Sequence, residues 1–147
     1  MSTHDHQPIL DAQLSQLEIT FQEGSAIDAK ALAILATNVA LVIFMAQGRL
    51  YFSEWWQNAA LYGPFFVSIV LDAYTFLKSG YHGPGINRHQ LPSYLAMSDQ
   101  QQRLQFISTL TLANETNVAL NKSRWRQFFM SLVFTFIGSI AILLYYL

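Results

Sequence analysis

The chain has 147 residues, of which 52% are hydrophobic and only 12% are charged. Soluble domains carry roughly 25% charged residues, so this balance disfavours a free soluble monomer and indicates one membrane domain. Eight basic and nine acidic residues give a net charge of -1, which argues against nucleic acid as a partner, and the absence of cysteine excludes a disulfide scaffold and a thiol nucleophile.

Three stretches are long and apolar enough to cross the roughly 30 Å hydrocarbon core of a bilayer as helices. They cover residues 29–47, 59–77 and 128–147. The first has no charge after Lys30, the second has one acid, Asp72, and the third has none. We therefore predict an all-α membrane protein, and we consider a soluble bundle with very apolar helices the weaker interpretation.

The segments around these spans complete a four-part organisation. Residues 1–28 are predicted to form a cytoplasmic tail with an N-terminal amphipathic helix, and residues 29–77 form a hairpin of two spans. Residues 78–127 form a cytoplasmic loop and helix, and this helix runs into the third span at residues 128–147.

The N-terminal helix is predicted from apolar residues at helical spacing, which place one apolar face on it. These residues are Leu10, Leu14, Leu17 and Phe21. Gly24 and Ser25 are expected to break the helix, and a capping box from Ser25 to Asp28 is expected to open the first span. The polar face is acidic, so the helix is expected to pack on the cytoplasmic part rather than on lipid.

The distribution of basic residues predicts the orientation of the spans. The short connection between the first two spans contains only Arg49, whereas the long connection contains six basic residues: Lys78, Arg88, Arg103, Lys122, Arg124 and Arg126. We expect both the N-terminus and the long connection in the cytoplasm and the C-terminus outside. An outer aromatic belt is then predicted from Tyr51, Phe52, Trp55 and Trp56, with Tyr145 and Tyr146 at the same level.

A turn-rich loop is predicted over residues 79–93, and a cap formed by Ser98 and Gln101 is expected to start one long helix at Asp99. A seam of residues at heptad-like spacing runs along this helix: Ile107, Leu110, Asn114, Asn117, Asn121 and Arg124. Three successive asparagines in such a seam indicate a wet groove, a channel wall or a polar ligand site. The alternative is an ordinary solvated helix face.

Two polar residues lie inside the predicted spans. Asp72 either lines an ion pathway or forms a packing salt bridge with Lys30, because an isolated charge in a span is costly. Asn38 either contributes interhelical packing or lines a pore in an oligomer. Both remain candidates for a membrane pathway or for packing.

The basic residues before the third span have two interpretations. Lys122, Arg124 and Arg126 can be a positive-inside anchor, or Lys122 and Arg124 can bind a phosphate together with Arg88. Arg103 is a further candidate phosphate contact. The four histidines lack metal-ligand spacing and no catalytic motif is present, so we expect neither a metal site, a bound cofactor nor enzyme activity.

Two short motifs carry a family resemblance. Asp28, Lys30 and the apolar run after them resemble the start of the first span in small bacterial antiphage membrane effectors, namely the transmembrane Pycsar effectors and the related SLATT two-helix effectors. Asn117, Lys122 and Arg126 resemble the start of the third span in that group.

The resemblance implies a resting homo-oligomer in the bacterial inner membrane that serves antiviral defence. On a phage-triggered or nucleotide-type signal, such as a cyclic nucleotide, it would permeabilise the membrane in a pore-forming manner and abort infection. Two alternatives remain open. One is a non-enzymatic membrane anchor or scaffold that presents its cytoplasmic helices to a soluble partner, and the other is a constitutive transporter or channel subunit.

Overall fold

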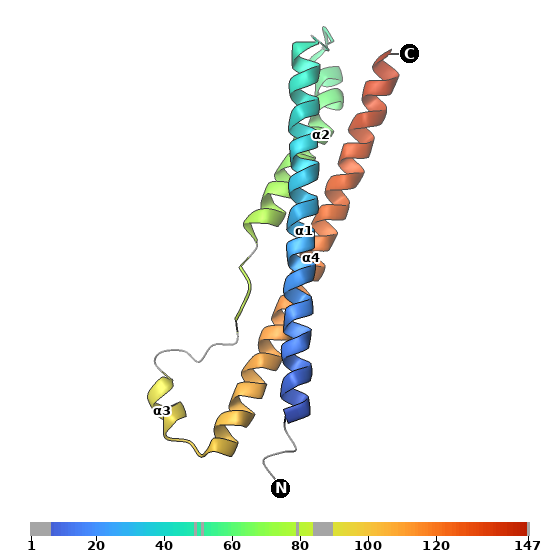
Figure 1. Cartoon of the computed structure of the whole chain (residues 1–147). Coiled ribbons are helices and arrows are strands. Elements are labelled where there is room, and N and C mark those ends of the chain that lie inside the picture. The colour runs from blue at the N-terminus through green and yellow to red at the C-terminus, as the bar shows by residue number, and fades with distance from the viewer. Residues whose placement is uncertain (1–6, 49, 51, 79, 84–89, 147) are drawn as a thin grey trace. The chain divides into compact units, whose positions relative to one another are not determined.

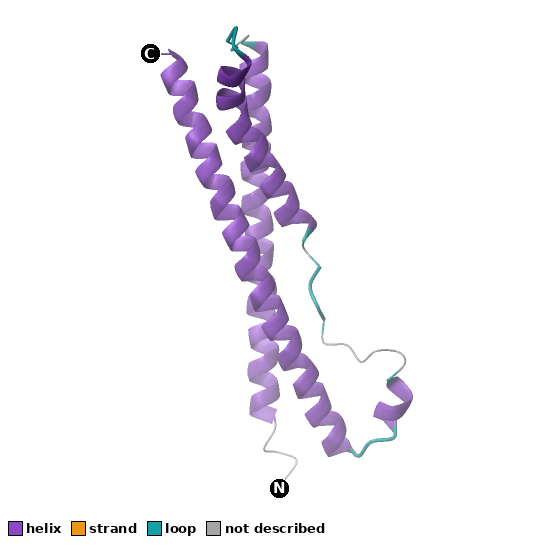
Figure 2. Cartoon of the chain, turned by 180° about the vertical axis from the view of Figure 1, so that it is seen from behind, coloured by secondary structure: helices purple, strands orange, loops and turns teal. Residues whose placement is uncertain are grey.

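The computed structural model of the chain describes residues 7–48, 50, 52–78, 80–83 and 90–146. These residues form four helices: α1 (Gln7–Gln47), α2 (Trp55–Leu77), α3 (Leu91–Leu95) and α4 (Asp99–Tyr146). Figures 1 and 2 show only helices and connecting segments, and the described part of the chain contains no strand. The all-α class predicted from composition and periodicity is confirmed.

Helices α1, α2 and α4 are each long and apolar enough to cross a membrane. The apolar runs predicted as spans lie within these three helices as far as the described residues extend, and α1 and α2 end at the predicted residues Gln47 and Leu77. These properties are consistent with a multi-pass membrane protein.

The chain divides into two compact units. Unit 1 contains Met1–Gly24 and Gly80–Asn121, and unit 2 contains Ser25–Ser79 and Lys122–Leu147. Unit 2 therefore holds the three apolar runs, and unit 1 holds the mostly polar remainder. The division between the two units falls near the domain boundaries predicted from the sequence. Those boundaries state where the chain enters and leaves the membrane, and they remain predictions.

The expected helix break at Gly24 and Ser25 is wrong, because α1 continues through both residues without interruption. Gly24 has a packing role instead. A Cβ atom at this position would overlap the phenol of Tyr81, which belongs to the same unit. The glycine therefore admits the Tyr81 ring against the backbone of α1, and the ring also meets Phe21 edge-on with centroids 5.3 Å apart.

The predicted apolar face of the N-terminal helix is also rotated from the observed one. Leu17 is buried as expected, but Leu14 and Phe21 are 43% and 37% exposed. Thr20 is buried beside Leu17, at 2% exposure. Close backbone contact selects this face, because side chains of α4 in this unit bond to the carbonyl groups of Gln13 and Thr20.

In unit 2 the segments of α1, α2 and α4 lie side by side (Figures 1 and 2). Each presents a buried seam with alternating spacings of three and four residues, the pattern of helices packed with a slight left-handed supercoil. On α2 the seam is Leu61, Phe65, Ser68, Asp72 and Thr75. On α4 it is Arg124, Phe128, Ser131 and Gly138, with the half-buried Thr135 among them.

One end of unit 2 is closed by apolar side chains. Met45, Leu50, Leu61 and Phe65 form its core cluster. Phe52 packs against this cluster and meets the ring of Tyr145 with centroids 4.9 Å apart, so the predicted common level of these aromatic residues is confirmed for this pair. Arg49 and Tyr51, which the sequence placed in the same connection, lie outside the described residues.

The connection between α2 and α4 contains more structure than expected. The short helix α3 lies partly within the stretch predicted as a loop. The cap predicted at the start of α4 is confirmed, since the backbone N–H and the hydroxyl of Ser98 both lie 3.1 Å from Oε1 of Gln101.

The role of Gly24 can be tested by substitution. We expect Gly24→Ala to lower the free energy of unfolding by about 1–3 kcal/mol, the usual cost of overpacking, because Tyr81 must leave its position. Thermal unfolding of the purified protein in detergent measures this loss. Gly63→Ala is the matched control, since nothing lies within 4 Å of a Cβ at this glycine inside α2. Equal stability of the two variants would contradict the packing role of Gly24.

Candidate functional site

A layer of hydrogen-bonded polar side chains lies inside unit 2. Asn38 on α1, Ser68 on α2, and Ser131 and Thr135 on α4 form this layer. Asn38, Ser68 and Ser131 have no exposed surface. All three span helices therefore contribute to one polar layer, which we call the hydroxyl layer.

The side chains of the hydroxyl layer form hydrogen bonds with one another. Nδ2 of Asn38 donates to Oγ of Ser68 at 2.7 Å and to Oγ1 of Thr135 at 3.0 Å. The hydroxyl oxygens of Ser68 and Ser131 lie 2.6 Å apart, and those of Ser68 and Thr135 lie 2.9 Å apart. Hydroxyl groups both donate and accept, so the bonds among the three hydroxyl groups can reverse without moving heavy atoms, whereas Nδ2 of Asn38 only donates.

Asp72 lies one helical turn from Ser68 on α2 and is 1% exposed. Neither of its carboxyl oxygens has a hydrogen-bond partner among the described residues. The hydroxyls of Ser68 and Ser131 lie near the carboxyl group without reaching hydrogen-bond geometry. A buried carboxyl group without a partner is costly in any apolar environment, and such groups inside membrane helices are functional candidates by default.

The packing salt bridge proposed between Asp72 and Lys30 is wrong. Lys30 is exposed, and its Nζ lies 4.7 Å from the centre of the Trp125 ring. The ammonium group therefore interacts with an aromatic face instead of the acid.

A buried ion pair lies beyond Asp72 in the same unit. The guanidinium of Arg124 pairs with Asp28, and its Nε donates to the carbonyl oxygen of Thr75 at 3.1 Å. Arg124 has no exposed side-chain surface, and this burial lowers the pKa of its guanidinium. Asp28 is 27% exposed. The pair therefore joins α1, α2 and α4.

On the side of the hydroxyl layer away from Asp72, the interior of unit 2 is packed with apolar groups. A Cβ on Gly138 would lie 2.6 Å from the ring of Phe65, so this glycine lets the ring pack directly against the backbone of α4. The polar file of unit 2 thus consists of Arg124, Asp72 and the hydroxyl layer, and the apolar cluster around Phe65 closes it.

In unit 1 the asparagine seam of α4 is buried, so its interpretation as a solvated face is wrong. Asn114, Asn117 and Asn121 are at most 3% exposed. Asn117 exchanges two hydrogen bonds of 2.9 Å with the backbone N–H and carbonyl of His82, and Asn121 donates to the carbonyl of Thr20 at 2.8 Å. These amides hold backbone segments of the unit together. This is a structural role, and it needs neither a ligand nor a channel.

Tyr81 completes this seam by donating to Oδ1 of Asn121 at 2.7 Å. Burial of the phenol, and secondarily the negative charge of Glu23, raise the pKa of Tyr81. The phenol therefore remains protonated and can act as the donor in this hydrogen bond.

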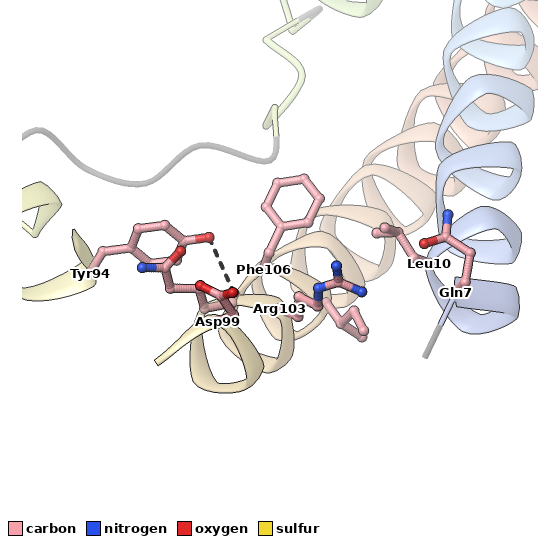
Figure 3. Close-up of a pocket in the computed structure, with 8 residues that line it drawn as sticks. Gln7, Leu10, Tyr94, Asp99, Arg103 and Phe106 are labelled. Atoms are coloured by element: carbon pink, nitrogen blue, oxygen red, sulfur yellow. Dashed lines mark hydrogen bonds between the residues drawn. The ribbon is translucent and has the colours of Figure 1, made fainter. Parts of the chain in front are cut away.

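Unit 1 also contains a pocket of about 410 Å³ between the start of α1 and the start of α4. Figure 3 shows Tyr94, Asp99, Arg103 and Phe106 on one side and Gln7 and Leu10 of α1 on the other. The pocket offers aromatic surface from Tyr94 and Phe106, and the guanidinium of Arg103 offers charge and hydrogen-bond donors. This combination suits a planar ligand that carries an anionic group.

The four predicted phosphate contacts fall in different parts of the chain. Arg103 lies at the pocket of unit 1. Arg124 is buried in unit 2 with Asp28, and Lys122 is exposed in that unit. Arg88 lies outside the described residues. Of the residues that matched the family motifs, Asp28 is in the ion pair, Asn117 is in the asparagine seam, and Lys30 and Arg126 are exposed.

Sequence reasoning missed Ser68, Ser131 and Thr135. A signal was present, because the spacing that connects Asn114, Asn117, Asn121 and Arg124 continues through Phe128 to Ser131, Thr135 and Gly138. The apolar composition of the run after Arg126 concealed this continuation. Following the heptad into the span would have indicated that these hydroxyl groups face inward.

Among the described residues, no group of three or more His, Asp or Glu side chains is placed to hold a metal ion. No protein-family model, curated protein or solved structure matches the chain. The functional argument therefore depends on the geometry of the two units.

The ion pair can be tested by removing one partner and then both. We expect Arg124→Met to lower the free energy of unfolding by about 2–4 kcal/mol, because Asp28 then keeps a charge in a partly buried site. The double variant Asp28→Leu with Arg124→Met is expected to recover at least half of this loss. Thermal unfolding in detergent compares the three proteins. A double variant less stable than Arg124→Met would contradict the pairing.

Proposed function

We propose that this protein is a non-enzymatic membrane effector that permeabilises the membrane in response to a signal. The observation that carries the proposal is the polar file in unit 2, above all the unpartnered Asp72. Apolar side chains alone can anchor a helix in lipid. An ionisable group inside a span makes insertion less favourable, and such groups ordinarily have a functional role. The resemblance to antiphage effectors favours antiviral defence by abortive infection as the biological setting.

The closed bundle supports a specific mechanism of opening. The hydroxyl layer satisfies its own hydrogen bonds, and the cluster around Phe65 excludes water beyond it. Displacement of α4 would separate Ser131 and Thr135 from Asn38 and Ser68 and would expose these groups to water. Three spans cannot enclose a pathway alone, so the open state requires a homo-oligomer in which the polar files of several copies meet.

The signal is proposed to bind in the pocket of unit 1. Arg103 supplies a phosphate contact, and Tyr94 and Phe106 supply surfaces for a planar base. A cyclic nucleotide has both features, and binding would act on α4, which provides Asp99, Arg103 and Phe106. Arg124 is assigned a packing role because its guanidinium is held by Asp28 and Thr75.

The same arrangement supports a location and an orientation. Basic residues surround the end of unit 2 at which the ion pair lies: the exposed Lys30, Lys122 and Arg126, and the half-buried Lys78. We call these residues the basic collar. Basic residues next to membrane spans favour the cytoplasmic side. We therefore place this end of unit 2 and the N-terminus on the cytoplasmic side of a bacterial inner membrane, and the C-terminus on the outer side.

The function predicts a loss of membrane potential that depends on Asp72. In bacteria that express the chain, phage infection or addition of a cyclic nucleotide (cyclic AMP, GMP, CMP or UMP) should depolarise the membrane, as read by a potential-sensitive dye. Asp72→Asn should reduce the rate of depolarisation about tenfold or more, because the ionisable group of the pathway is lost while the shape is kept.

Asp11→Asn is the matched control for Asp72→Asn. It removes one acid from an exposed position of unit 1 and should leave the depolarisation unchanged. Membrane fractionation verifies that each variant inserts. If the inserted wild-type protein causes no depolarisation under any of these triggers, the effector function is wrong and the scaffold becomes the better explanation.

The signal site predicts a separate phenotype. Arg103→Gln should abolish the response to the active cyclic nucleotide but leave insertion and any unstimulated leak unchanged, because the residue belongs to unit 1 and not to the polar file. Isothermal titration of the purified protein with that nucleotide measures the loss of binding directly. An unchanged affinity in Arg103→Gln would remove this pocket from the mechanism.

A second candidate function is a membrane scaffold, and one observation favours it. Unit 1 exposes several large apolar side chains, among them Ile19 at 53%, Leu104 at 46% and Leu112 at 64%. Such surface suits contact with a soluble partner or another copy. A scaffold would tolerate Asp72→Asn and would cause no depolarisation, so the experiment above separates the two functions.

A further inference from the structure

A groove on the outer surface of unit 2 lies between α2 and α4. It has a volume of about 400 Å³. Ser123, Arg126 and Gln127 of α4 line one end of it, and the remaining lining residues are apolar. The groove is separate from the polar file, whose residues face the interior of the bundle.

The polar end of the groove belongs to the basic collar. Arg126 is exposed there, and Nζ of Lys78 donates to Oγ of Ser123 at 3.2 Å. One positive charge therefore lies at the Ser123 hydroxyl, and Arg126 lines the same end of the groove. An arginine side chain in this setting binds phosphate with up to two parallel hydrogen bonds.

The apolar end extends along both helices toward the middle of the span. Met130 and Phe134 follow Arg126 on α4 at one-turn intervals, which corresponds to about 12 Å from Arg126 to Phe134. Val67 and Leu71 face them from α2. Val67 is 42% exposed and Met130 is 47% exposed, so this end is open to a hydrocarbon chain.

Gln127, one of the residues that line the groove, has an unused hydrogen-bond acceptor. Oε1 of Gln127 is buried and has no partner among the described residues. A buried amide oxygen without a donor is costly, so its position beside Arg126 indicates a ligand that brings a donor as well as a phosphate.

We propose that this groove binds one anionic phospholipid whose headgroup carries a hydrogen-bond donor, as phosphatidylglycerol does. The phosphate lies against Arg126 and Lys78, a headgroup hydroxyl donates to Oε1 of Gln127, and one acyl chain lies along Leu71, Met130 and Phe134. The polar and apolar ends follow the order of headgroup and chain in a phospholipid. The site stands on the contacts of unit 2 and does not depend on the effector function.

Native mass spectrometry of the delipidated, full-length protein in detergent tests the site. Phosphatidylglycerol should bind more tightly than phosphatidylcholine, which has no net charge, and more tightly than phosphatidylmethanol, which lacks the headgroup hydroxyl. Arg126→Gln should weaken the binding of phosphatidylglycerol about tenfold, because it removes a charge-assisted contact. Gln127→Leu should make phosphatidylglycerol and phosphatidylmethanol bind equally.

Two further variants separate this site from general attraction between basic residues and anionic lipid. Met130→Trp should fill the apolar end and weaken phosphatidylglycerol and phosphatidylcholine alike. Lys30→Gln is the matched control, since it removes an exposed charge of the basic collar that does not line the groove. Thermal unfolding of each variant verifies that it is folded.

Three results would overturn the proposal. Equal weakening by Lys30→Gln and Arg126→Gln would indicate nonspecific attraction to the basic collar. Competition by glycerol phosphate at the affinity of the lipid would identify a site for a soluble phosphate. Equal affinities of folded wild-type protein for phosphatidylglycerol and phosphatidylcholine would exclude a headgroup-selective site.

Discussion

The fold depends on one constraint, which is that polar groups buried between apolar helices must find partners within the chain. Helix α4 meets this constraint with a seam whose positions alternate by three and four residues. In unit 1 the seam contains asparagines that bond to backbone groups, and in unit 2 it contains Arg124, Ser131 and Thr135. Asp72 is the clearest exception among the described residues, since neither of its carboxyl oxygens has a hydrogen-bond partner, whereas Gln105, Asn114 and Gln127 each leave one buried amide oxygen without a partner. That exception is the reason for placing function in the polar file.

Much of the fold followed from simple patterns in the sequence. Runs of apolar residues predicted the helices that can span a membrane, and the cap at Ser98 predicted where α4 begins. The failures have physical causes. Gly24 is a poor helix former, but contact with Tyr81 retains it inside α1. The leucines of the N-terminal segment suggested an apolar face, whereas close backbone contacts select the face with Thr20. The partners of Asp28 and Lys30 depend on contacts between distant parts of the chain, which spacing alone does not specify.

Unit 2 uses opposite chemistry on its inner and outer surfaces. Inside, hydroxyl and amide groups bond to one another and leave Asp72 beside them. Outside, apolar side chains are exposed and the basic collar marks one end. The two surfaces meet on α2 and α4, because Ser68 and Leu71 are neighbours on one helix and Gln127 and Ser131 on the other. Lipid in the outer groove would therefore contact the same helices that must separate for the polar file to open.

The asparagine seam also has an evolutionary consequence. Asn114, Asn117 and Asn121 direct their amides to carbonyl groups of the main chain at Gln13, His82 and Thr20. A carbonyl group is present whatever side chain a residue carries, so these main-chain contacts would survive substitution at the accepting positions, while the donating asparagines could not change. Two side-chain bonds, from Asn114 to Oε1 of Gln13 and from Tyr81 to Oδ1 of Asn121, would still link substitutions on the two sides. Methods that infer contacts from correlated changes would then detect this interface mainly through those two pairs.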